Sequence, residues 1–363
     1  MVIRYTIRND RSSRDVCSDF RQRSWIVEPN STPKMCNCIW NVCLIYFVVQ
    51  LFGFWISGNA VAETQAETKE LTIQHQGRDR SFLLHIPATI DHQQSSPVVI
   101  NLHGGGGNAR GQQDYSRMDI TAAKYQFIVV YPNGTGKLKQ RLLTWNAGTC
   151  CGYAMQNNID DVGFIRKIIS VLPQYIKINP QRIYATGLSN GAMMSYRLAL
   201  ELSDKIAAIA PVAGAMHVAE FNPQRPVPIM HVHSVDDPRA LYHGGLGPAF
   251  PLTNHRVEHR DVNEVLEQWA EYNRCQQGPQ LYKQVSVTTK EHGEQRAEKW
   301  AYTACRHRAE VVLWKLTGAG HVWPGGQQDY MVKILGPSTQ VINVNDVMWR
   351  FFAEHELSLP VNK

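Results

Sequence analysis

The residues that decide the fold are Gly187-Leu188-Ser189-Asn190-Gly191. They follow a short β-type run at 181–186, which predicts a strand, and open an apolar-periodic segment at 190–202, which predicts a helix. A Gly-x-Ser-x-Gly sequence between a strand and a helix is typical of a nucleophile elbow, in which the glycines leave room for a strained serine turn. A plain turn is the alternative, because so short a pattern also recurs by chance. We therefore predict that Ser189 is a nucleophile if suitable partners lie elsewhere in the chain.

A serine nucleophile needs a base to take its proton and a carboxylate to orient that base. His321 lies in a glycine-rich loop after the apolar run 311–316, and we predict that it is the base. A surface loop histidine is the alternative. The acid is expected after the apolar run 228–233, where Asp236 and Asp237 are neighbours. Nucleophile, acid and base then follow one another along the chain in the order that such an elbow requires.

A third element lies upstream, where the apolar run 97–102 and His103 are followed by four glycines. Bare glycine amides can approach a tetrahedral oxyanion closely, and the amide after the nucleophile can approach it from the other side. We predict an oxyanion hole formed by the backbone N–H groups of Gly104, Gly105 and Asn190. A phosphate-binding loop is the competing interpretation, but no Lys-Ser or Lys-Thr follows these glycines.

Strand and helix patterns alternate through the chain, which predicts an α/β fold with a mostly parallel, doubly wound sheet. An antiparallel hairpin is expected at its N-terminal end, over 71–75 and 81–86, and an extra β-rich piece over 275–306. The other expected strands are 97–102, 127–131, 182–186, 206–212, 228–233 and 311–316, and the helices 112–124, 161–175, 190–202, 261–274 and 343–354.

Several motifs together resemble the secreted poly(3-hydroxybutyrate) depolymerase and feruloyl esterase group of α/β-hydrolases. The resemblance extends from about Leu71 to the C-terminus and is carried by Leu102-His103-Gly104-Gly105-Gly106-Gly107-Asn108, Tyr131-Pro132-Asn133-Gly134, Trp145-Asn146-Ala147-Gly148, Cys150-Cys151-Gly152, Asp160-Asp161-Val162-Gly163-Phe164-Ile165, Gly187-Leu188-Ser189-Asn190-Gly191 and Gly318-Ala319-Gly320-His321-Val322-Trp323-Pro324-Gly325-Gly326. It implies the α/β-hydrolase fold.

The resemblance also implies a triad of Ser189, His321 and an aspartate that precedes proline. The family's acid loop usually reads His-Gly, a few residues, Asp-Pro, then Tyr and a Gly pair. Here His233-Ser234 replaces His-Gly, while Asp237-Pro238, Tyr242 and Gly244-Gly245 keep the register, so we choose Asp237 over Asp236.

The activity implied is that of a serine carboxylic-ester hydrolase, which works through an acyl-enzyme without a cofactor. The expected substrates are hydroxyalkanoate polyesters or oligomers, and the alternative is a feruloyl or acetylxylan ester of plant polysaccharide. A serine peptidase and a catalytically silent binding protein are weaker alternatives. The formal charge of +6 on 363 residues is spread along the chain, so no nucleic-acid partner is expected.

The N-terminal region predicts export. An apolar stretch at 39–56 follows Lys34 and precedes Ala60-Val61-Ala62, which is the pattern of a cleaved signal peptide. We expect an extension without structure at 1–34, a signal peptide at 35–62 and one catalytic domain at 63–363, in a secreted, extracellular or periplasmic protein. A membrane anchor is the alternative; after cleavage no stable membrane association is expected.

Four of the eight cysteines would remain after cleavage. Cys275 ends a helical pattern and Cys305 a strand-like run, which favours a disulfide between them. Cys150 and Cys151 are left as a vicinal disulfide or as two thiols. A metal site is not expected, because the chain contains no Cys-x-x-Cys.

Several other residues can be interpreted either as functional or as structural. Trp145 and Trp323 lie next to glycine-rich loops and are predicted to bind substrate, with plain packing as the alternative. Asp160-Asp161 are better explained by capping of the next helix than by catalysis. His231 and His233 share one face of a strand, where a structural role is favoured over metal ligation because no third ligand is evident.

Overall fold

The computed structural model describes residues 66–250, 254–328 and 330–358. All of them belong to one unit, Thr64–Lys363. The predicted extension at 1–34, the signal peptide at 35–62 and the boundary at residue 63 lie outside the described residues.

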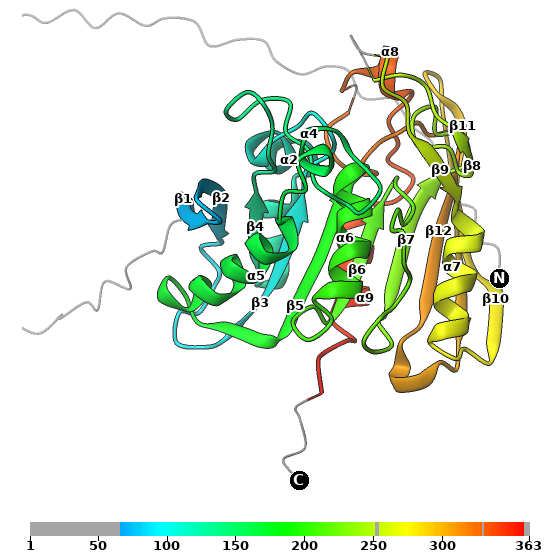
Figure 1. The fold of residues 1–363 in the computed structure, drawn as a ribbon. Coiled ribbons are helices and arrows are strands. Elements are labelled where there is room, and N and C mark those ends of the chain that lie inside the picture. Colours follow the sequence, from blue (N-terminus) through cyan, green and yellow to red (C-terminus); the bar gives the residue numbers. More distant parts are fainter. Residues whose placement is uncertain (1–65, 251–253, 329, 359–363) are drawn as a thin grey trace, which may run out of the picture. The chain divides into compact units, whose positions relative to one another are not determined.

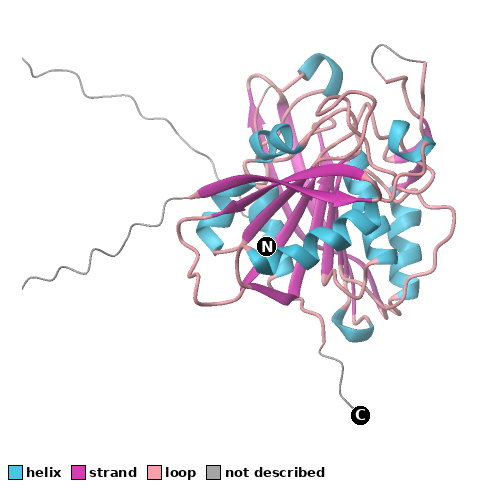
Figure 2. Cartoon of the chain, turned by 60° about the vertical axis from the view of Figure 1, so that its left-hand side comes forward, coloured by secondary structure: helices cyan, strands magenta, loops and turns pink. Residues whose placement is uncertain are grey.

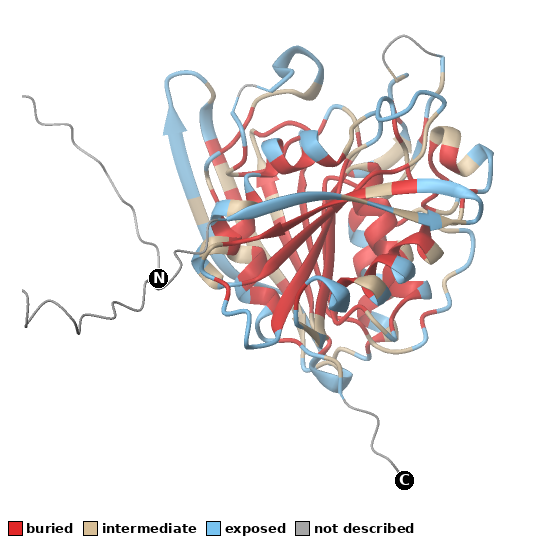
Figure 3. Ribbon diagram, turned by 90° about the vertical axis from the view of Figure 1, so that its left-hand side faces the viewer, coloured by how far each residue is buried: buried red, intermediate tan, exposed pale blue. Residues whose placement is uncertain are grey.

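The fold is organised on a sheet whose strand order is β1-β2-β4-β3-β5-β6-β7-β12-β11-β10 (Figure 1). Its parallel centre consists of β3 (Ser96–Leu102), β4 (Ile128–Pro132), β5 (Ile178–Leu188), β6 (Ala208–Val212), β7 (Ile229–Ser234) and β12 (Val311–Thr317). Every residue of β3, β4, β6 and β7 is buried, as expected for strands covered on both faces (Figure 3). The predicted α/β-hydrolase fold with a mostly parallel sheet is confirmed.

Antiparallel strands form both edges of this sheet. The expected N-terminal hairpin is β1 (Glu67–His75) and β2 (Arg78–Ile86), and β2 pairs antiparallel with β4. The β-rich piece of the sequence is β10 (Gln277–Thr289) and β11 (Gly293–Thr303), which continue the main sheet beyond β12. A short separate pair, β8 (His243–Leu246) and β9 (Glu258–Asp261), lies in the chain between β7 and α7.

Helices cover both faces of the sheet (Figure 2). Residues of α5 (Asp161–Val171), α6 (Asn190–Glu201) and α7 (Val262–Tyr272) belong to one buried cluster, and residues of α2 (Ala109–Ser116), α3 (Met118–Tyr125) and α9 (Val344–Phe352) to another. The remaining helices are the short α4 (Gly152–Gln156) and α8 (Val332–Leu335). The single helix expected at 112–124 is wrong: Arg117 has φ 52° and ψ 29°, a left-handed conformation that ends α2 before α3 begins.

Asp160 caps α5, as the sequence analysis favoured. Its side chain accepts a hydrogen bond from the backbone N–H of Gly163 at 2.8 Å. Such a bond satisfies one of the amides that the first turn of a helix leaves without a partner.

Cys275, just after α7, is disulfide-bonded to Cys305, just after β11, and Cys150 is bonded to Cys151. The first bond closes a loop with a sequence separation of 30 residues. Such a link restricts the unfolded chain, so we expect the double variant Cys275→Ala/Cys305→Ala to lose about 2–4 kcal/mol in free energy of unfolding, measured by urea denaturation. Under reducing conditions that open the bond, the wild type and the variant are expected to converge. A difference that persisted under reduction would contradict the role of the cross-link.

Candidate active site

Ser189 lies at the turn between β5 and α6, with φ 57° and ψ −117°. This conformation is rare for any residue other than glycine and is strained. A Cβ atom at Gly187 would lie 2.6 Å from the carbonyl oxygen of Leu102, and one at Gly191 would lie 2.7 Å from that of His103. Both distances are too short for real contacts, so the turn requires glycine on each side of the serine.

The strain at Ser189 gives a prediction about stability. Ser189→Gly removes the positive-φ penalty, while Ser189→Ala keeps it, and both remove the hydroxyl. We expect the glycine variant to be more stable than the alanine variant by about 1 kcal/mol, because relief of strain outweighs the larger entropy of unfolded glycine. Thermal unfolding of the two purified variants measures this difference. Equal stability, or a more stable alanine variant, would show that the backbone at Ser189 is not strained.

His321 and Asp237 form a buried pair at the ends of two adjacent strands. Asp237 follows β7 and His321 follows β12, and their side chains are joined by a hydrogen bond of 2.7 Å between His321 Nδ1 and Asp237 Oδ2. Both residues are at most 5% exposed. A carboxylate only accepts, so Nδ1 carries the proton, which leaves Nε2 of the neutral ring free to act as a base.

The carboxylate of Asp237 is strongly stabilised in its ionised form. Its Oδ1 accepts hydrogen bonds from the backbone N–H groups of Arg239 at 2.7 Å and Ala240 at 2.9 Å. Burial by itself raises the pKa of this carboxyl, but the charge of His321 and the hydrogen bonds from His233 and His321 outweigh it and hold the pKa well below its ordinary value. Asp237 is therefore a fixed negative charge behind the imidazole.

The neighbouring Asp236 has a different role. It is exposed, and its Oδ2 accepts a hydrogen bond from the backbone N–H of Gly318 at 2.7 Å. This contact ties the β7 loop to the loop that carries His321. The backbone N–H of His321 also donates to the carbonyl of Leu335 at 2.6 Å, which holds the same loop from its other side.

The amides predicted for an oxyanion hole lie around the serine turn. A Cβ at Gly104 would be 3.6 Å from Cβ of Ser189, and one at Gly105 would be 3.6 Å from Cβ of Asn190. Asn190 is the first residue of α6, so its N–H has no acceptor within the helix. Gly104 and the start of the helix thus lie next to Ser189, and Gly105 lies next to Asn190.

His103 is a contributor that sequence reasoning did not single out. Its Nε2 accepts the backbone N–H of Gly134 at 2.9 Å, so the proton of the neutral ring is on Nδ1 and is donated to the carbonyl of Gly104 at 2.8 Å. Burial lowers the pKa of His103 to about 4, with Gly104 opposing and Arg80 assisting the shift. A neutral imidazole therefore braces the glycine loop. Its position directly after β3 was the available signal.

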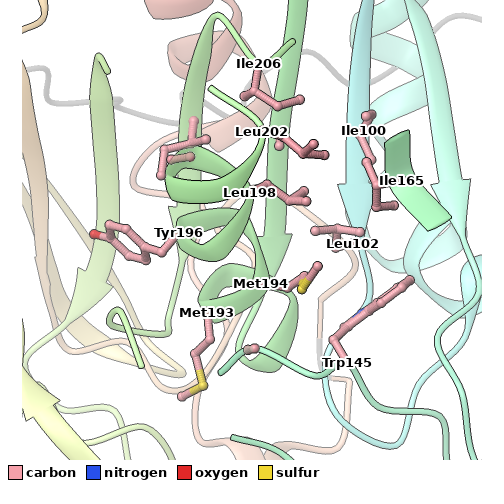
Figure 4. Packing of buried hydrophobic residues seen from close by; sticks show 14 of the residues in the cluster. Ile100, Leu102, Trp145, Ile165, Met193, Met194, Tyr196, Leu198, Leu202 and Ile206 are labelled. Atoms are coloured by element: carbon pink, nitrogen blue, oxygen red, sulfur yellow. The ribbon is translucent and has the colours of Figure 1, made fainter. Parts of the chain in front are cut away.

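The two tryptophans predicted to bind substrate are buried instead. Trp145 is 0% and Trp323 2% exposed. The indole N–H of Trp145 donates to the carbonyl of His103 at 2.9 Å, and that of Trp323 donates to Asn345 Oδ1 at 2.9 Å. Neither ring presents a face to a substrate in this structure, so the packing alternative describes them better. Trp145 is seen among the buried side chains beside α6 in Figure 4.

The buried amide of Asn190 holds the Trp145 backbone from both sides. Asn190 Oδ1 accepts the N–H of Trp145 at 2.7 Å, and Asn190 Nδ2 donates to its carbonyl at 3.1 Å. Asn190 therefore contributes its side chain to the support of the site as well as its backbone N–H.

Among residues 66–250, 254–328 and 330–358, no three His, Cys, Asp or Glu side chains are grouped so as to hold a metal ion. Within the same ranges, no helix combines the length and apolar character needed to cross a bilayer.

A serine elbow on a mostly parallel sheet, followed along the chain by a buried Asp–His pair, defines the α/β-hydrolase class. A family model described as "Esterase PHB depolymerase" matches residues 80–285, more than half of the chain. The chain belongs to the esterase PHB depolymerase family and is a carboxylic-ester hydrolase.

Individual relatives agree with this class. NocK of Nocardia uniformis subsp. tsuyamanensis, which is named as an esterase, is 24% identical over 290 residues, 79% of this chain and 82% of its own length. Feruloyl esterase B of Piromyces equi is 27% identical over 257 residues, and the match spans only 44% of that longer protein. The structure of an acetyl xylan esterase from Aspergillus awamori covers 79% of this chain and 99% of its own with a TM-score of 0.51, but at 14% identity it shows the fold alone.

Proposed function

We propose that this protein hydrolyses esters with Ser189 as nucleophile, His321 as base and Asp237 as the residue that orients His321. The observation that carries the proposal is the 2.7 Å hydrogen bond between His321 Nδ1 and Asp237 Oδ2. It leaves Nε2 as the acceptor that a serine nucleophile needs.

The reaction proceeds in two acyl transfers. Ser189 Oγ attacks the ester carbonyl as His321 Nε2 takes its proton, and the amides of Gly104, Gly105 and Asn190 stabilise the resulting oxyanion. Collapse of the intermediate breaks the ester C–O bond, and His321 returns the proton to the departing alcohol. Water then attacks the acyl-enzyme, again giving its proton to His321, and the acid is released as Ser189 regains a proton. The charge of Asp237 stabilises the imidazolium in both steps.

The surroundings of the oxyanion loop favour an apolar substrate. A Cβ at Gly106 would lie 4.0 Å from Leu142, and one at Gly105 would lie 3.8 Å from the ring of Phe250. Leu142 is 66% exposed although it is apolar. Apolar side chains exposed beside a site suit apolar ligands. We therefore propose hydroxyalkanoate oligomers or polyesters as the substrate.

The second candidate is a feruloyl or acetyl ester of plant polysaccharide. It is supported by the names of the relatives, feruloyl esterase B of Piromyces equi and an acetyl xylan esterase from Aspergillus awamori. Against the feruloyl ester, the buried Trp145 and Trp323 offer no ring on which the substrate could stack.

A substrate panel tests the proposal. The purified protein is assayed on p-nitrophenyl butyrate, methyl ferulate, acetylated xylan and hydroxybutyrate oligomers, and kcat/KM is compared. We expect the hydroxybutyrate oligomers to be preferred over methyl ferulate and acetylated xylan by at least about tenfold, as apolar contacts along an aliphatic chain accumulate. A preference of the same size for either plant ester would overturn the substrate assignment in favour of the alternative.

We also propose that the protein is exported, to the outside of the cell or to the periplasm. The support is the apolar stretch at 39–56 followed by Ala60-Val61-Ala62. N-terminal sequencing of exported protein is expected to begin at Glu63; a chain that kept residues 39–56 would contradict cleavage.

A further inference from the structure

A line of buried polar side chains continues from Asp237 into the interior. His231 and His233 lie on β7 and Tyr196 on α6, and all three are at most 1% exposed. Tyr196 Oη is 3.0 Å from His231 Nδ1, and His231 Nε2 is 3.0 Å from His233 Nδ1. His233 Nε2 lies 2.8 Å from the carbonyl oxygen of Ala240 and 3.3 Å from Asp237 Oδ2. We call these three side chains, Tyr196, His231 and His233, the buried relay.

With a neutral His233, the acceptors at the end of the relay set the direction of every hydrogen bond in it. A carbonyl and a carboxylate can only accept, so His233 Nε2 carries a proton. In a neutral ring His233 Nδ1 is then an acceptor, and His231 Nε2 must donate to it. His231 Nδ1 is in turn an acceptor and receives the O–H of Tyr196. All bonds therefore point from Tyr196 toward Asp237.

Burial keeps Tyr196 and His231 uncharged. Burial, assisted by the neighbouring His233, lowers the pKa of His231 well below its ordinary value. Burial likewise raises the pKa of Tyr196, so its hydroxyl keeps its proton. Tyr196 and His231 are therefore both uncharged.

The other titratable and charged groups near the relay do not replace these bonds. Tyr242 packs its ring edge-on against His233, with centroids 5.7 Å apart, but its hydroxyl donates to Asn263. Burial lowers the pKa of His259 to about 4, with His217 lowering it further and Asp237 opposing.

Arg260 acts on Tyr196 only through its charge, and Trp269 of α7 stacks near the same ring. Figure 4 shows Tyr196 projecting from α6 on the side away from Trp145.

Burial of three polar side chains costs more free energy than burial of apolar side chains of similar size, unless every polar atom is hydrogen-bonded. We propose that Tyr196, His231 and His233 are positioning residues, which hold the ring of His233 in place so that its Nε2–H keeps the Asp237 carboxylate turned toward His321. This inference rests on the proposed function of Asp237 and His321. Without the Tyr196 hydroxyl, His231 Nδ1 becomes a buried acceptor without a donor, so the His231 ring is free to shift. Its hydrogen bond to His233 Nδ1 then weakens, and His233 holds the Asp237 carboxylate less firmly.

The test compares Tyr196→Phe with a matched control, Tyr184→Phe. Tyr184 is also fully buried and donates its hydroxyl to a backbone carbonyl, that of His355, at 2.7 Å. We expect Tyr196→Phe to lower kcat by roughly tenfold at unchanged KM, since a misplaced base slows the chemical step without weakening binding. The acidic limb of its kcat/KM profile moves to higher pH, because less hydrogen bonding to Asp237 leaves more negative charge beside His321 and favours the protonated imidazole. Tyr184→Phe is expected to change stability alone.

Substitutions at His233 separate positioning from packing. His233→Leu is expected to reproduce the loss of kcat and the shift of the acidic limb. His233→Gln places an amide donor near the position of Nε2. It is expected to recover part of the wild-type kcat and to reverse part of the shift of the acidic limb. If His233→Leu kept the wild-type kcat and pH profile, or if Tyr184→Phe shifted the limb as far as Tyr196→Phe, the proposal would be overturned.

A readout independent of activity keeps the relay and the proposed function distinguishable. Long-range ¹H–¹⁵N NMR spectra of the folded protein are expected to show His231 and His233 as neutral Nε2–H tautomers. In Tyr196→Phe the ¹⁵N shift of His231 Nδ1 is expected to change, because that nitrogen loses its donor. Any other tautomer in the wild type overturns the relay. A wild type with the expected tautomers but no ester hydrolysis would instead contradict the proposed function and, with it, a positioning role in this reaction.

Discussion

Ser189→Ala is expected to lower kcat for ester hydrolysis by about 10⁴- to 10⁶-fold, because the variant cannot form the acyl-enzyme and retains only binding and the oxyanion amides. The substitution removes one hydroxyl and leaves the backbone of the turn as it is. Its melting temperature is therefore expected to stay close to that of the wild type. Steady-state hydrolysis of p-nitrophenyl butyrate measures the effect.

Ser195→Ala is the matched control for this variant. Ser195 lies on α6, the helix that follows Ser189, and is fully buried. Its hydroxyl donates to the carbonyl of Gly191 at 2.9 Å. It has no place in the proposed chemistry, so kcat should stay within about twofold of the wild type. Hydrolysis by Ser189→Ala at more than about one hundredth of the wild-type rate would mean that another group is the nucleophile.

Arg80→Met is expected to give the largest loss of stability, about 3–5 kcal/mol, because it leaves a carboxylate buried without its ion partner. Arg80 Nη2 lies 2.6 Å from Asp161 Oδ1, and both side chains are almost inaccessible, at 4% and 0% exposure. The guanidinium also lies 3.9 Å over the ring of Phe164. Asp161 Oδ2 accepts the backbone N–H of Asn146 at 2.8 Å, so the pair links β2 and α5 to the loop that contains Trp145 and Asn146.

The loss of stability in Arg80→Met is expected to grow with pH. Burial raises the pKa of Asp161, even though Arg80 opposes that shift. Without Arg80 the pKa rises further, so the folded variant binds a proton more readily than the unfolded chain. The stability of Arg80→Met is then greatest below the ordinary carboxyl pKa of about 4. It falls as the pH rises through the raised pKa of Asp161 in the folded variant. Urea denaturation at pH 5 and pH 8 is expected to show the larger deficit at pH 8.

Two controls accompany Arg80→Met. Arg166→Met breaks the exposed pair with Asp204, whose members are 47% and 53% accessible, and should cost about 1 kcal/mol or less. The double variant Arg80→Met/Asp161→Asn removes the buried charge and should be more stable than Arg80→Met alone at pH 8. A deficit independent of pH, or no larger than that of Arg166→Met, would contradict this account of the buried pair.

The parts of the site that the sequence predicted are those with a local cause. Ser189 is defined by the glycines that its own turn requires, and the amides near it follow from glycines at the end of one strand. The family resemblance favoured Asp237 over its neighbour Asp236, because Asp237 precedes the proline of the acid loop. In the structure only Asp237 bonds to His321. The order of strands and helices likewise follows from patterns within each segment.

The parts that were missed depend on contacts between distant segments. Tyr196 and His231 are 35 residues apart in the chain and bond only in the folded protein, where α6 lies over β5 and β6, next to β7. Trp145 lies beside a glycine-rich loop, as expected, but the direction of its ring is decided by Asn190 and His103, which the local sequence does not reveal. The left-handed Arg117 that divides α2 from α3 has no glycine or proline to mark it.

The central claim is that Ser189 Oγ is the atom that becomes acylated. Treatment of the folded protein with a phosphonate ester, a stable mimic of the tetrahedral intermediate, followed by proteolysis and mass spectrometry, tests it most directly. The account predicts a single covalent adduct on Ser189, formed with loss of activity and absent from Ser189→Ala. An adduct on another residue, or full esterase activity with Ser189 unmodified, would contradict it.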